Sequence, residues 1–178
     1  VSGDDQFGVA SVGVPDVLRV RVRDQYGNPV RDVPVTFSTT GGTVTPTQVQ
    51  SNAGGVAETT WVPDASAGAQ SVTASVAGVS PVQFNATVQP RDALVALQNT
   101  IAVSGLSESA GSRRYFAITV PPNVVTVAFA VSGPAGDADL FVRRGALPST
   151  TSYECRSVSA TATELCVVNA PEAGEWYV

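Results

Sequence analysis

Two carboxylates in the second half of the chain have a spacing that could hold a metal ion. Asp137 and Asp139 stand two positions apart in the segment Gly136-Asp-Ala-Asp-Leu-Phe-Val142, for which we predict a strand. Side chains two positions apart on a strand project from the same face. Calcium prefers clustered oxygen ligands of this kind, so it is the one cofactor that the sequence indicates. The alternative is that one Asp caps the turn after Gly136 while the other binds the backbone of a neighbouring loop.

A second pair of residues with its own chemistry is formed by the only cysteines, Cys155 and Cys166. An even number of cysteines in a loop-rich β protein predicts one disulfide, which forms in an oxidising compartment. The alternative is two reduced thiols buried in a core.

Aromatic side chains supply the candidate binding surface. Tyr and Trp offer broad contact areas with one polar atom, which suits a surface that binds a polymer. In a small β domain most of these rings belong to the core instead, and strand alternation would place one of Trp176 and Tyr177 inside and the other outside. The candidates are Tyr115, Phe141, Tyr153, Trp176 and Tyr177.

Residue types that are absent exclude most catalytic machinery. The chain has no His, and all ten of its basic residues are Arg. Without His, neither a Ser-His-Asp nor a Cys-His arrangement can be built, and without Lys there is no Schiff-base chemistry. A carboxylate pair of the glycosidase kind is disfavoured, because neighbouring side chains on one strand face point in parallel rather than across a cleft. We therefore predict that this segment is not an enzyme.

Charge and composition exclude other classes of partner. The net charge is −5, with −3 in residues 1–90 and −2 in residues 91–178. Neither half is basic, so nucleic acid and anionic membrane surfaces are poor partners. The sequence contains no run of 18 apolar residues, which argues against membrane insertion. With 43% apolar and 14% charged residues, the 178-residue chain can build one or two cores.

The first half reads as short strands separated by turns. Residues 17–23 alternate Leu and Val with Arg, as in a half-buried strand whose Arg side chains face solvent. Gly27-Asn28-Pro29 is a strong turn signal, since Gly and Asn tolerate positive φ and Pro ends a ladder. Further alternating stretches follow around Phe37, Trp61 and Val72. No segment has helical periodicity, so we predict a β-sandwich.

Within this half, four motifs resemble the bacterial Ig-like repeat of the invasin and intimin group. They are Asp24-Gln-Tyr-Gly-Asn-Pro-Val30, Val33-Pro-Val-Thr-Phe37, Gly54-Gly-Val-Ala57 and Ala67-Gly-Ala-Gln-Ser-Val-Thr-Ala-Ser75. The resemblance implies an extracellular spacer or adhesin stalk and brings no catalytic residues. We assign residues 1–88 to this domain and residues 89–95, which include Pro90, to a linker.

Residues 96–178 resemble the bacterial pre-peptidase C-terminal domain. The motifs are Gly136-Asp-Ala-Asp-Leu-Phe-Val-Arg143, Tyr153-Glu-Cys155, Glu164-Leu-Cys166 and Ala170-Pro-Glu-Ala-Gly-Glu-Trp-Tyr-Val178. The resemblance implies a jelly-roll-like β-sandwich that accompanies secreted peptidases of unrelated catalytic types, is often removed during maturation, and has collagen-binding and calcium-binding relatives. The family domain continues with at least one more strand, so we expect this one to be truncated after Val178.

The sequence thus predicts an all-β chain of two consecutive β-sandwiches, Ig-like and then jelly-roll-like. We expect a secreted or cell-surface location. The first functional hypothesis is the accessory region of a secreted peptidase, with a catalytic domain upstream in the same polypeptide and an insoluble protein or polysaccharide as partner. The alternatives are an adhesin stalk with no attached enzyme and a spacer without a ligand.

Overall fold

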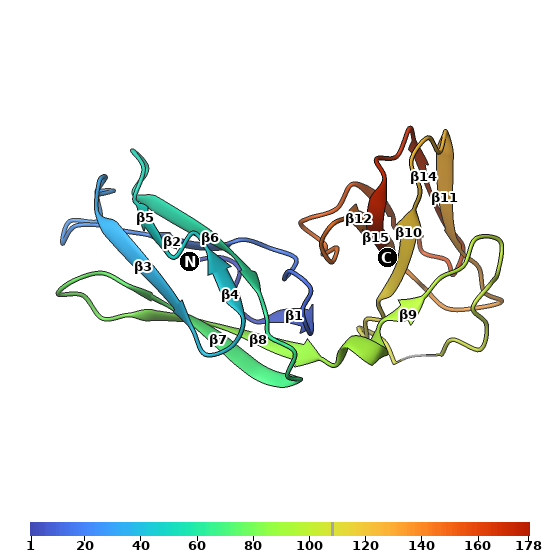
Figure 1. The fold of residues 1–178 in the computed structure, drawn as a ribbon, viewed down its shortest axis with the longest axis horizontal. Coiled ribbons are helices and arrows are strands. Elements are labelled where there is room, and N and C mark those ends of the chain that lie inside the picture. The colour runs from blue at the N-terminus through green and yellow to red at the C-terminus, as the bar shows by residue number, and fades with distance from the viewer. Residues whose placement is uncertain (108) are drawn as a thin grey trace. The chain divides into compact units, whose positions relative to one another are not determined.

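The structure is a computed structural model that describes residues 1–107 and 109–178. It divides the chain into two compact units, Val1–Arg91 (unit 1) and Asp92–Val178 (unit 2). Strands make up most of the regular structure of both units (Figure 1). The prediction of an all-β chain built from two consecutive sandwiches is confirmed. Among the described residues, no helix has the length and apolar character needed to cross a membrane.

Unit 1 is a sandwich of a five-stranded and a three-stranded sheet. The strand order is β1-β8-β7-β3-β5 in the larger sheet and β2-β6-β4 in the smaller one. All pairings are antiparallel except that of β1 with β8. The strands are β1 (Gln6–Val9), β2 (Leu18–Arg21), β3 (Pro34–Thr39), β4 (Thr43–Thr45), β5 (Gln48–Gln50), β6 (Val56–Val62), β7 (Gly68–Ser75) and β8 (Val82–Gln89).

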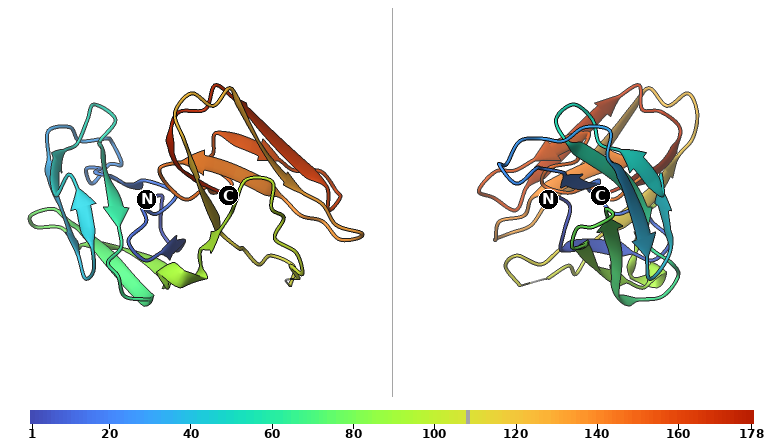
Figure 2. Two further views of the ribbon diagram at one scale, coloured as in Figure 1. Left: turned by 45° about the vertical axis from the view of Figure 1, so that its right-hand side comes forward. Right: turned by 90° about the vertical axis from the view of Figure 1, so that its left-hand side faces the viewer.

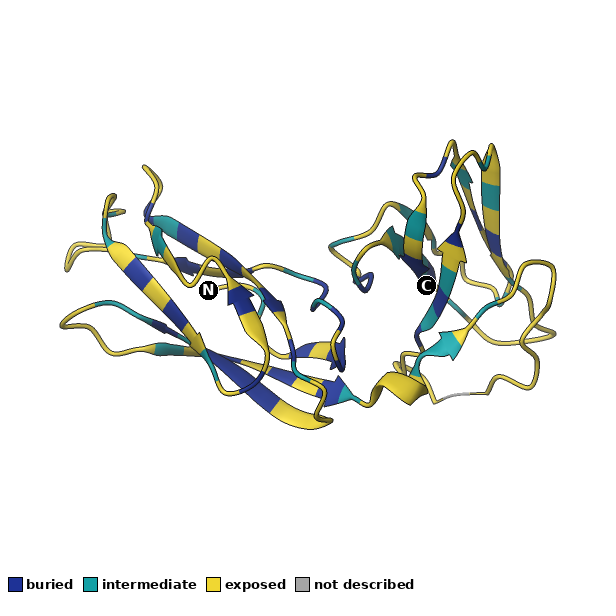
Figure 3. Cartoon of the chain, viewed as in Figure 1, coloured by how far each residue is buried: buried dark blue, intermediate teal, exposed yellow. Residues whose placement is uncertain are grey.

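Alternating sequence positions build the core of unit 1. Along β3, β6 and β8, buried residues alternate with exposed ones, which is visible as blue and yellow bands in Figure 3. Because side chains alternate between the faces of a strand, each sheet contributes one apolar face to the shared interior. Trp61 lies at the centre, and its indole N–H donates to the Gly41 carbonyl at 3.0 Å. Other large buried side chains of unit 1 include Leu18, Val35, Phe37, Val72 and Phe84.

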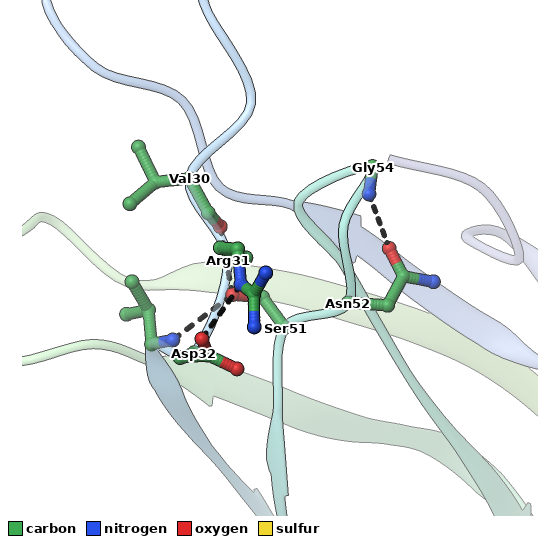
Figure 4. A network of polar contacts seen from close by, with 7 residues as sticks. Val30, Arg31, Asp32, Ser51, Asn52 and Gly54 are labelled. Atoms are coloured by element: carbon green, nitrogen blue, oxygen red, sulfur yellow. Dashed lines mark hydrogen bonds and ion pairs between the residues drawn. The ribbon is translucent and has the colours of Figure 1, made fainter.

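Side-chain hydrogen bonds hold the loops at one end of unit 1. The buried Ser51 hydroxyl donates to the Val30 carbonyl at 2.7 Å and accepts the Val33 N–H at 3.0 Å (Figure 4). In the turn between β5 and β6, the Asn52 side-chain oxygen accepts the Gly54 N–H at 2.9 Å. These bonds satisfy backbone groups that no strand pairs, and they stabilise the observed loop conformations.

Unit 2 is a sandwich of a five-stranded sheet, in the order β13-β12-β15-β10-β9, and the two-stranded ribbon β11-β14. Only the pairing of β9 with β10 is parallel (two further views are in Figure 2). The 3-10 turn η1 (Arg91–Ala93) precedes β9. The strands are β9 (Val95–Ala96), β10 (Phe116–Val120), β11 (Thr126–Val131), β12 (Leu140–Arg144), β13 (Cys155–Ser157), β14 (Glu164–Asn169) and β15 (Gly174–Tyr177).

The core of unit 2 is smaller and draws on both layers. Phe129 of β11 and Trp176 of β15 face each other with ring centroids 6.2 Å apart. Around them lie the buried residues Val120, Leu140, Val142 and Cys166. Several apolar neighbours, including Ile118, Val127 and Val168, are only partly buried. The interior of unit 2 is therefore less completely enclosed than that of unit 1.

Candidate functional site

The strongest candidate for a binding surface is a group formed by the half-buried Phe141 of β12, the exposed Tyr153 just before β13, and the exposed Arg156 of β13. The Phe141 and Tyr153 rings lie 5.9 Å apart at 60°, and the Arg156 guanidinium lies 5.1 Å from the centre of the Tyr153 ring. We call these three residues the aromatic–arginine cluster. Tyr153 is 37% exposed, and Arg156 is also exposed. The cluster combines a flat apolar area with a cation–π contact and hydrogen-bond donors.

Strand register explains why the cluster faces outward. On β12, Leu140 and Val142 are buried in the core, so Phe141 between them projects from the opposite face. Phe141 pairs directly with Arg156 of β13 in the antiparallel register. Cross-strand neighbours of this kind have close side chains. The Glu154 N–H donates to the Val142 carbonyl at 2.8 Å, which fixes the backbone next to Tyr153.

A disulfide anchors the strand that carries the cluster. Cys155 of β13 is bonded to Cys166 of β14, with Cα atoms 5.9 Å apart. Cys155 belongs to the five-stranded sheet and Cys166 to the two-stranded ribbon, so the bond links the two layers of unit 2. β13 has only three residues and lies at a sheet edge. The covalent link therefore holds a strand that few backbone bonds would hold.

A buried carboxylate organises the connection between β13 and β14. Glu164 is 2% exposed, and its carboxylate accepts hydrogen bonds from the hydroxyls of Ser157 and Ser159 and from the Ser159 N–H at 2.8 Å. The hydrogen bond from Ser157, and then that from Ser159, lowers the pKa of Glu164 from its ordinary value of 4.5. All these donors come from the same short segment, so Glu164 has a structural role.

Three of the five candidate binding residues are buried in the structure. Tyr115 and Tyr177 are 6% and 4% exposed, and Trp176 is 1% exposed. Trp176 fills the core against Phe129, and its indole N–H donates to the Glu172 carbonyl at 3.0 Å. β15 is the central strand of its sheet. The side chain of Trp176 is therefore covered more fully than strand alternation alone indicates. Tyr153 is the exception, because it is exposed.

The predicted calcium ligands lie in a loop rather than on a strand. β12 begins at Leu140, and Asp137 and Asp139 precede it as exposed residues. Gly136 has φ of 102°, and the Ala138 N–H donates to the Thr161 carbonyl at 3.2 Å, so the backbone is turned there instead of paired in a ladder. Calcium takes six to eight oxygens, and no group of three or more acidic, His or Cys residues lies together within residues 1–107 and 109–178. Calcium binding at Asp137 and Asp139 therefore stays a prediction.

A shallow depression near Arg144 is a weaker candidate, which the sequence did not indicate. Its volume is about 350 Å³, and Glu154, Glu172 and Trp176 contribute to its lining. Arg144 forms an ion pair with Glu172, and its guanidinium donates to the Ala173 carbonyl at 3.3 Å. Its backbone N–H donates to the Glu154 carboxylate at 3.1 Å. These groups satisfy one another, so the depression supports the turn before β15.

The two resemblances seen in the sequence are confirmed by family models. Residues 8–89 match the model of the bacterial Ig-like domain (group 1), and residues 112–178 match that of the bacterial pre-peptidase C-terminal domain. The first match lies within unit 1 and the second within unit 2.

The relatives include proteases of several bacteria. The chain is 36% identical over 76 residues to the zinc metalloprotease of Helicobacter pylori, which covers 43% of this chain and 29% of that protein. It is 36% identical over 76 residues to the hemagglutinin/proteinase of Vibrio cholerae (43% and 12%) and 34% identical over 82 residues to the alkaline serine exoprotease A of Vibrio alginolyticus (46% and 15%). The chain thus spans less than a third of each of these relatives.

Similar solved structures include those of intimin and invasin. The C-terminal 282-residue fragment of intimin, solved with the intimin-binding domain of its translocated receptor, is 17% identical, with a TM-score of 0.44 over 95% of this chain and 62% of that one. Invasin, a bacterial integrin-binding protein, is 14% identical, with a TM-score of 0.41 over 95% of this chain and 32% of that one.

Proposed function

We propose that this chain is a non-catalytic accessory region of a secreted bacterial peptidase. The observation that supports this most is that its relatives include a zinc metalloprotease and a serine exoprotease. These names denote different chemistry of peptide-bond cleavage. A segment shared by both serves a need that they have in common, such as secretion, maturation or substrate binding. The lack of His and Lys in this chain agrees with a non-catalytic role.

The two units divide this role between them. Unit 1 is a spacer, because its polar side chains hold its own loops and its large apolar side chains are mostly buried in one core. Unit 2 carries the aromatic–arginine cluster and is the binding module. A module that holds an attached catalytic domain near an insoluble substrate raises the local substrate concentration without new chemistry.

The composition of the cluster favours an insoluble protein as partner. The Phe141 and Tyr153 rings suit flat, apolar portions of an extended polypeptide, and Arg156 can donate to its carbonyl or carboxylate oxygens. Such a partner is also the substrate of a peptidase. A polysaccharide is the alternative, since sugar rings also stack on aromatic faces.

Retention on insoluble polymers tests this proposal. The whole chain is incubated with fibrous collagen, chitin and cellulose, and the bound fraction is measured. We expect retention on collagen, and we expect Tyr153→Ser to weaken it by about tenfold or more, as for loss of an aromatic anchor. Tyr26→Ser is the matched control, because Tyr26 is 79% exposed but belongs to unit 1.

Each outcome decides between the hypotheses. Retention on collagen that Tyr153→Ser abolishes and Tyr26→Ser leaves intact supports the peptidase accessory. Retention that depends on Tyr26 instead, or binding to polysaccharide alone, favours the stalk of a cell-surface adhesin. The match of residues 8–89 to the bacterial Ig-like domain supports this alternative. If the chain binds none of the polymers, the binding role is contradicted and the hypothesis of a spacer without a ligand remains.

A further inference from the structure

The two outer faces of the unit 1 sandwich differ in charge. Every charged residue in the strands of unit 1 belongs to the three-stranded sheet, namely Arg19, Arg21 and Glu58. The five-stranded sheet of β1, β3, β5, β7 and β8 contains no charged residue, although 14% of the whole chain is charged. Surfaces of small soluble domains ordinarily carry interspersed charges of both signs. The larger sheet therefore presents an unusual, uncharged face to solvent.

Strand register arranges hydroxyl and amide side chains of this face in two rows. Buried residues such as Val35, Phe37 and Phe84 alternate with the members of the rows, which therefore project outward; on β3 and β8 their positions are yellow in Figure 3. One row crosses β5, β3 and β7, and the other crosses β3, β7 and β8, with partners in direct register. We call these six residues the neutral grid: Gln48, Thr36 and Ser75 in the first row, and Ser38, Thr73 and Gln83 in the second.

Most side chains of the neutral grid do not use their hydrogen-bonding groups within the protein. The Gln48 amide donates to the Thr36 hydroxyl, but at the long distance of 3.4 Å. The other four side chains form no hydrogen bond with another residue of the described chain, namely Ser38, Thr73, Ser75 and Gln83. Each hydroxyl or amide can both donate and accept. The neutral grid therefore offers a repeated set of neutral donors and acceptors to a partner.

Polar groups on the opposite face of unit 1 satisfy one another instead. The Arg19 guanidinium pairs with the Glu58 carboxylate at 2.7 Å, and the Thr60 hydroxyl donates to the Thr45 carbonyl at 3.0 Å. The two outer faces thus differ both in charge and in the use of their polar groups. Only the face of the larger sheet combines neutrality with hydrogen-bonding groups that are open to a ligand.

These properties define the chemistry of a matching partner. A charged polymer would give up part of its hydration against the neutral grid without meeting an opposite charge. An apolar partner would leave the hydroxyl and amide groups of the grid without hydrogen bonds. Sugar hydroxyls donate and accept hydrogen bonds and carry no charge, and a polysaccharide repeats them along its length. An uncharged polysaccharide therefore complements the grid.

The border of the neutral grid further disfavours an anionic polymer. Asn85 stands two positions after Gln83 on β8, and its backbone N–H donates to the Asp4 carboxylate at 2.7 Å. This carboxylate lies beside the edge of the uncharged face and would repel acidic sugars. The border thus agrees with selection of a neutral polymer.

We propose that the neutral grid is a docking surface for an uncharged polysaccharide. Sugar hydroxyls exchange hydrogen bonds with the two rows, and many weak contacts along one polymer add up to retention without a pocket. The inference goes beyond the spacer role of unit 1. It depends neither on the aromatic–arginine cluster nor on an attached peptidase.

Retention on neutral polysaccharides tests this proposal. The whole chain is incubated with amorphous cellulose, chitin and an insoluble β-1,3-glucan, and the bound fraction is measured over a range of polymer concentrations. We expect retention on at least one of these polymers. Its strength should stay the same between about 0.05 and 0.5 M sodium chloride, because contacts between uncharged groups are not screened by salt.

The variant Ser38→Ala/Thr73→Val/Gln83→Ala removes the hydrogen-bonding groups of one row. It should weaken retention by about tenfold or more, since three hydrogen bonds to the polymer are lost. Thr43→Val/Thr60→Val is the matched control, because these residues are exposed on β4 and β6 of the opposite sheet. An unchanged urea midpoint, read from Trp61 fluorescence, verifies that each variant is folded. The milder variant Gln83→Ala, at an exposed strand position, should weaken retention several-fold and gives a second check.

Three results would overturn the proposal: no retention on any of the neutral polymers, retention that the folded triple variant leaves unchanged, and retention that added salt abolishes. Polysaccharide retention that Tyr153→Ser removes would place the site on the aromatic–arginine cluster and would also contradict it. Retention on collagen is measured separately. Failure of the collagen experiment therefore leaves this inference standing, and failure on the neutral polymers leaves the collagen result standing.

Discussion

Two glycines of unit 1 share a backbone conformation but differ in their surroundings. Gly42 and Gly27 have φ of 86° and 87°. A Cβ on Gly42 would lie 2.0 Å from the Val62 carbonyl oxygen, whereas a Cβ on Gly27 would meet nothing within 4 Å. Gly42 therefore allows two backbone segments to approach closely, whereas Gly27 only allows the backbone to turn.

We predict that Gly27→Ala destabilises the chain by about 1–2 kcal/mol, which is the cost of positive φ for a residue with a Cβ. Gly42→Ala should cost more than about 4 kcal/mol, because backbone atoms must also move. Urea unfolding followed by Trp61 fluorescence measures both values. Equal losses for the two variants would show that the contact at Gly42 relaxes freely.

The hydrogen bonds of Glu164 predict how the stability of unit 2 depends on pH. Its pKa is lower in the folded chain than its ordinary value of 4.5, so the ionised carboxylate stabilises the fold. This contribution is fully present above pH 4.5 and is lost as the pH falls through the lowered pKa. Glu164→Gln should therefore destabilise unit 2 at pH 7 and have a smaller effect at pH 3.

The effect of Glu164→Gln is measured from the urea midpoints of the wild-type chain and the variant at pH 7, 5 and 3. Trp176 fluorescence reports the unfolding. Glu58→Gln is a suitable control, because the Glu58 carboxylate pairs with Arg19 at 2.7 Å on the surface of unit 1. A constant difference between wild type and Glu164→Gln across this pH range would contradict the assignment.

At the scale of elements, unit 2 depends on a covalent link between its layers. The β11–β14 ribbon has two strands, and its outward face carries the apolar side chains of Ala128, Ala130, Leu165 and Val167. The ribbon pairs with no other strand among the described residues. The disulfide from β14 to β13 therefore fixes its position over the larger sheet.

We predict that Cys155→Ser/Cys166→Ser lowers the free energy of unfolding of unit 2 by about 2–3 kcal/mol, as expected for closure of a loop of this length. A Trp61→Phe background leaves Trp176 as the only indole, so its fluorescence reports unit 2 alone. In a Trp176→Phe background, the signal of Trp61 should show no change in unit 1. A loss of stability in both units would contradict this account.

At the scale of the whole molecule, each unit has its own core. The residues buried around Trp61 all come from unit 1, and those around Trp176 all come from unit 2. Separate cores are consistent with the two family matches, which cover different parts of the chain. The two units can therefore be combined or separated without loss of either interior.

Much of unit 1 could be predicted because its signals are local. The turn at Asp24 to Pro29 follows from Gly27, Asn28 and Pro29, and the structure adds that Asp24 closes it with three hydrogen bonds. Arg19 on β2 lies on the solvent face and pairs with Glu58 of β6, as the alternation of that segment indicates. Strand period and turn chemistry depend on neighbours in sequence, so sequence patterns capture them.

The candidate site was predicted less completely, because it depends on neighbours that are remote in sequence. Tyr153 was among the predicted residues, but the contribution of Arg156 was missed. Arg156 stands one position after Cys155, and a strand through that cysteine would have placed it on the outer face. The predicted strand begins at Asp137, which is too far toward the N-terminus. Gly136 and the hydrogen bond from the Ala138 N–H to the Thr161 carbonyl keep this stretch in a loop.

The sequence by itself determined the all-β class, the order of the two units and the absence of His and Lys residues, and it predicted one disulfide between the only two cysteines. These follow from period, turn residues and composition, which need no three-dimensional neighbours. Only the tertiary structure decided which rings are exposed. Alternation assigns a side chain to one of two faces, but the position of its strand in the sheet decides whether that face is covered. Trp176 on the central strand β15 is therefore buried, whereas Tyr153 beside the edge strand β13 stays open to a partner.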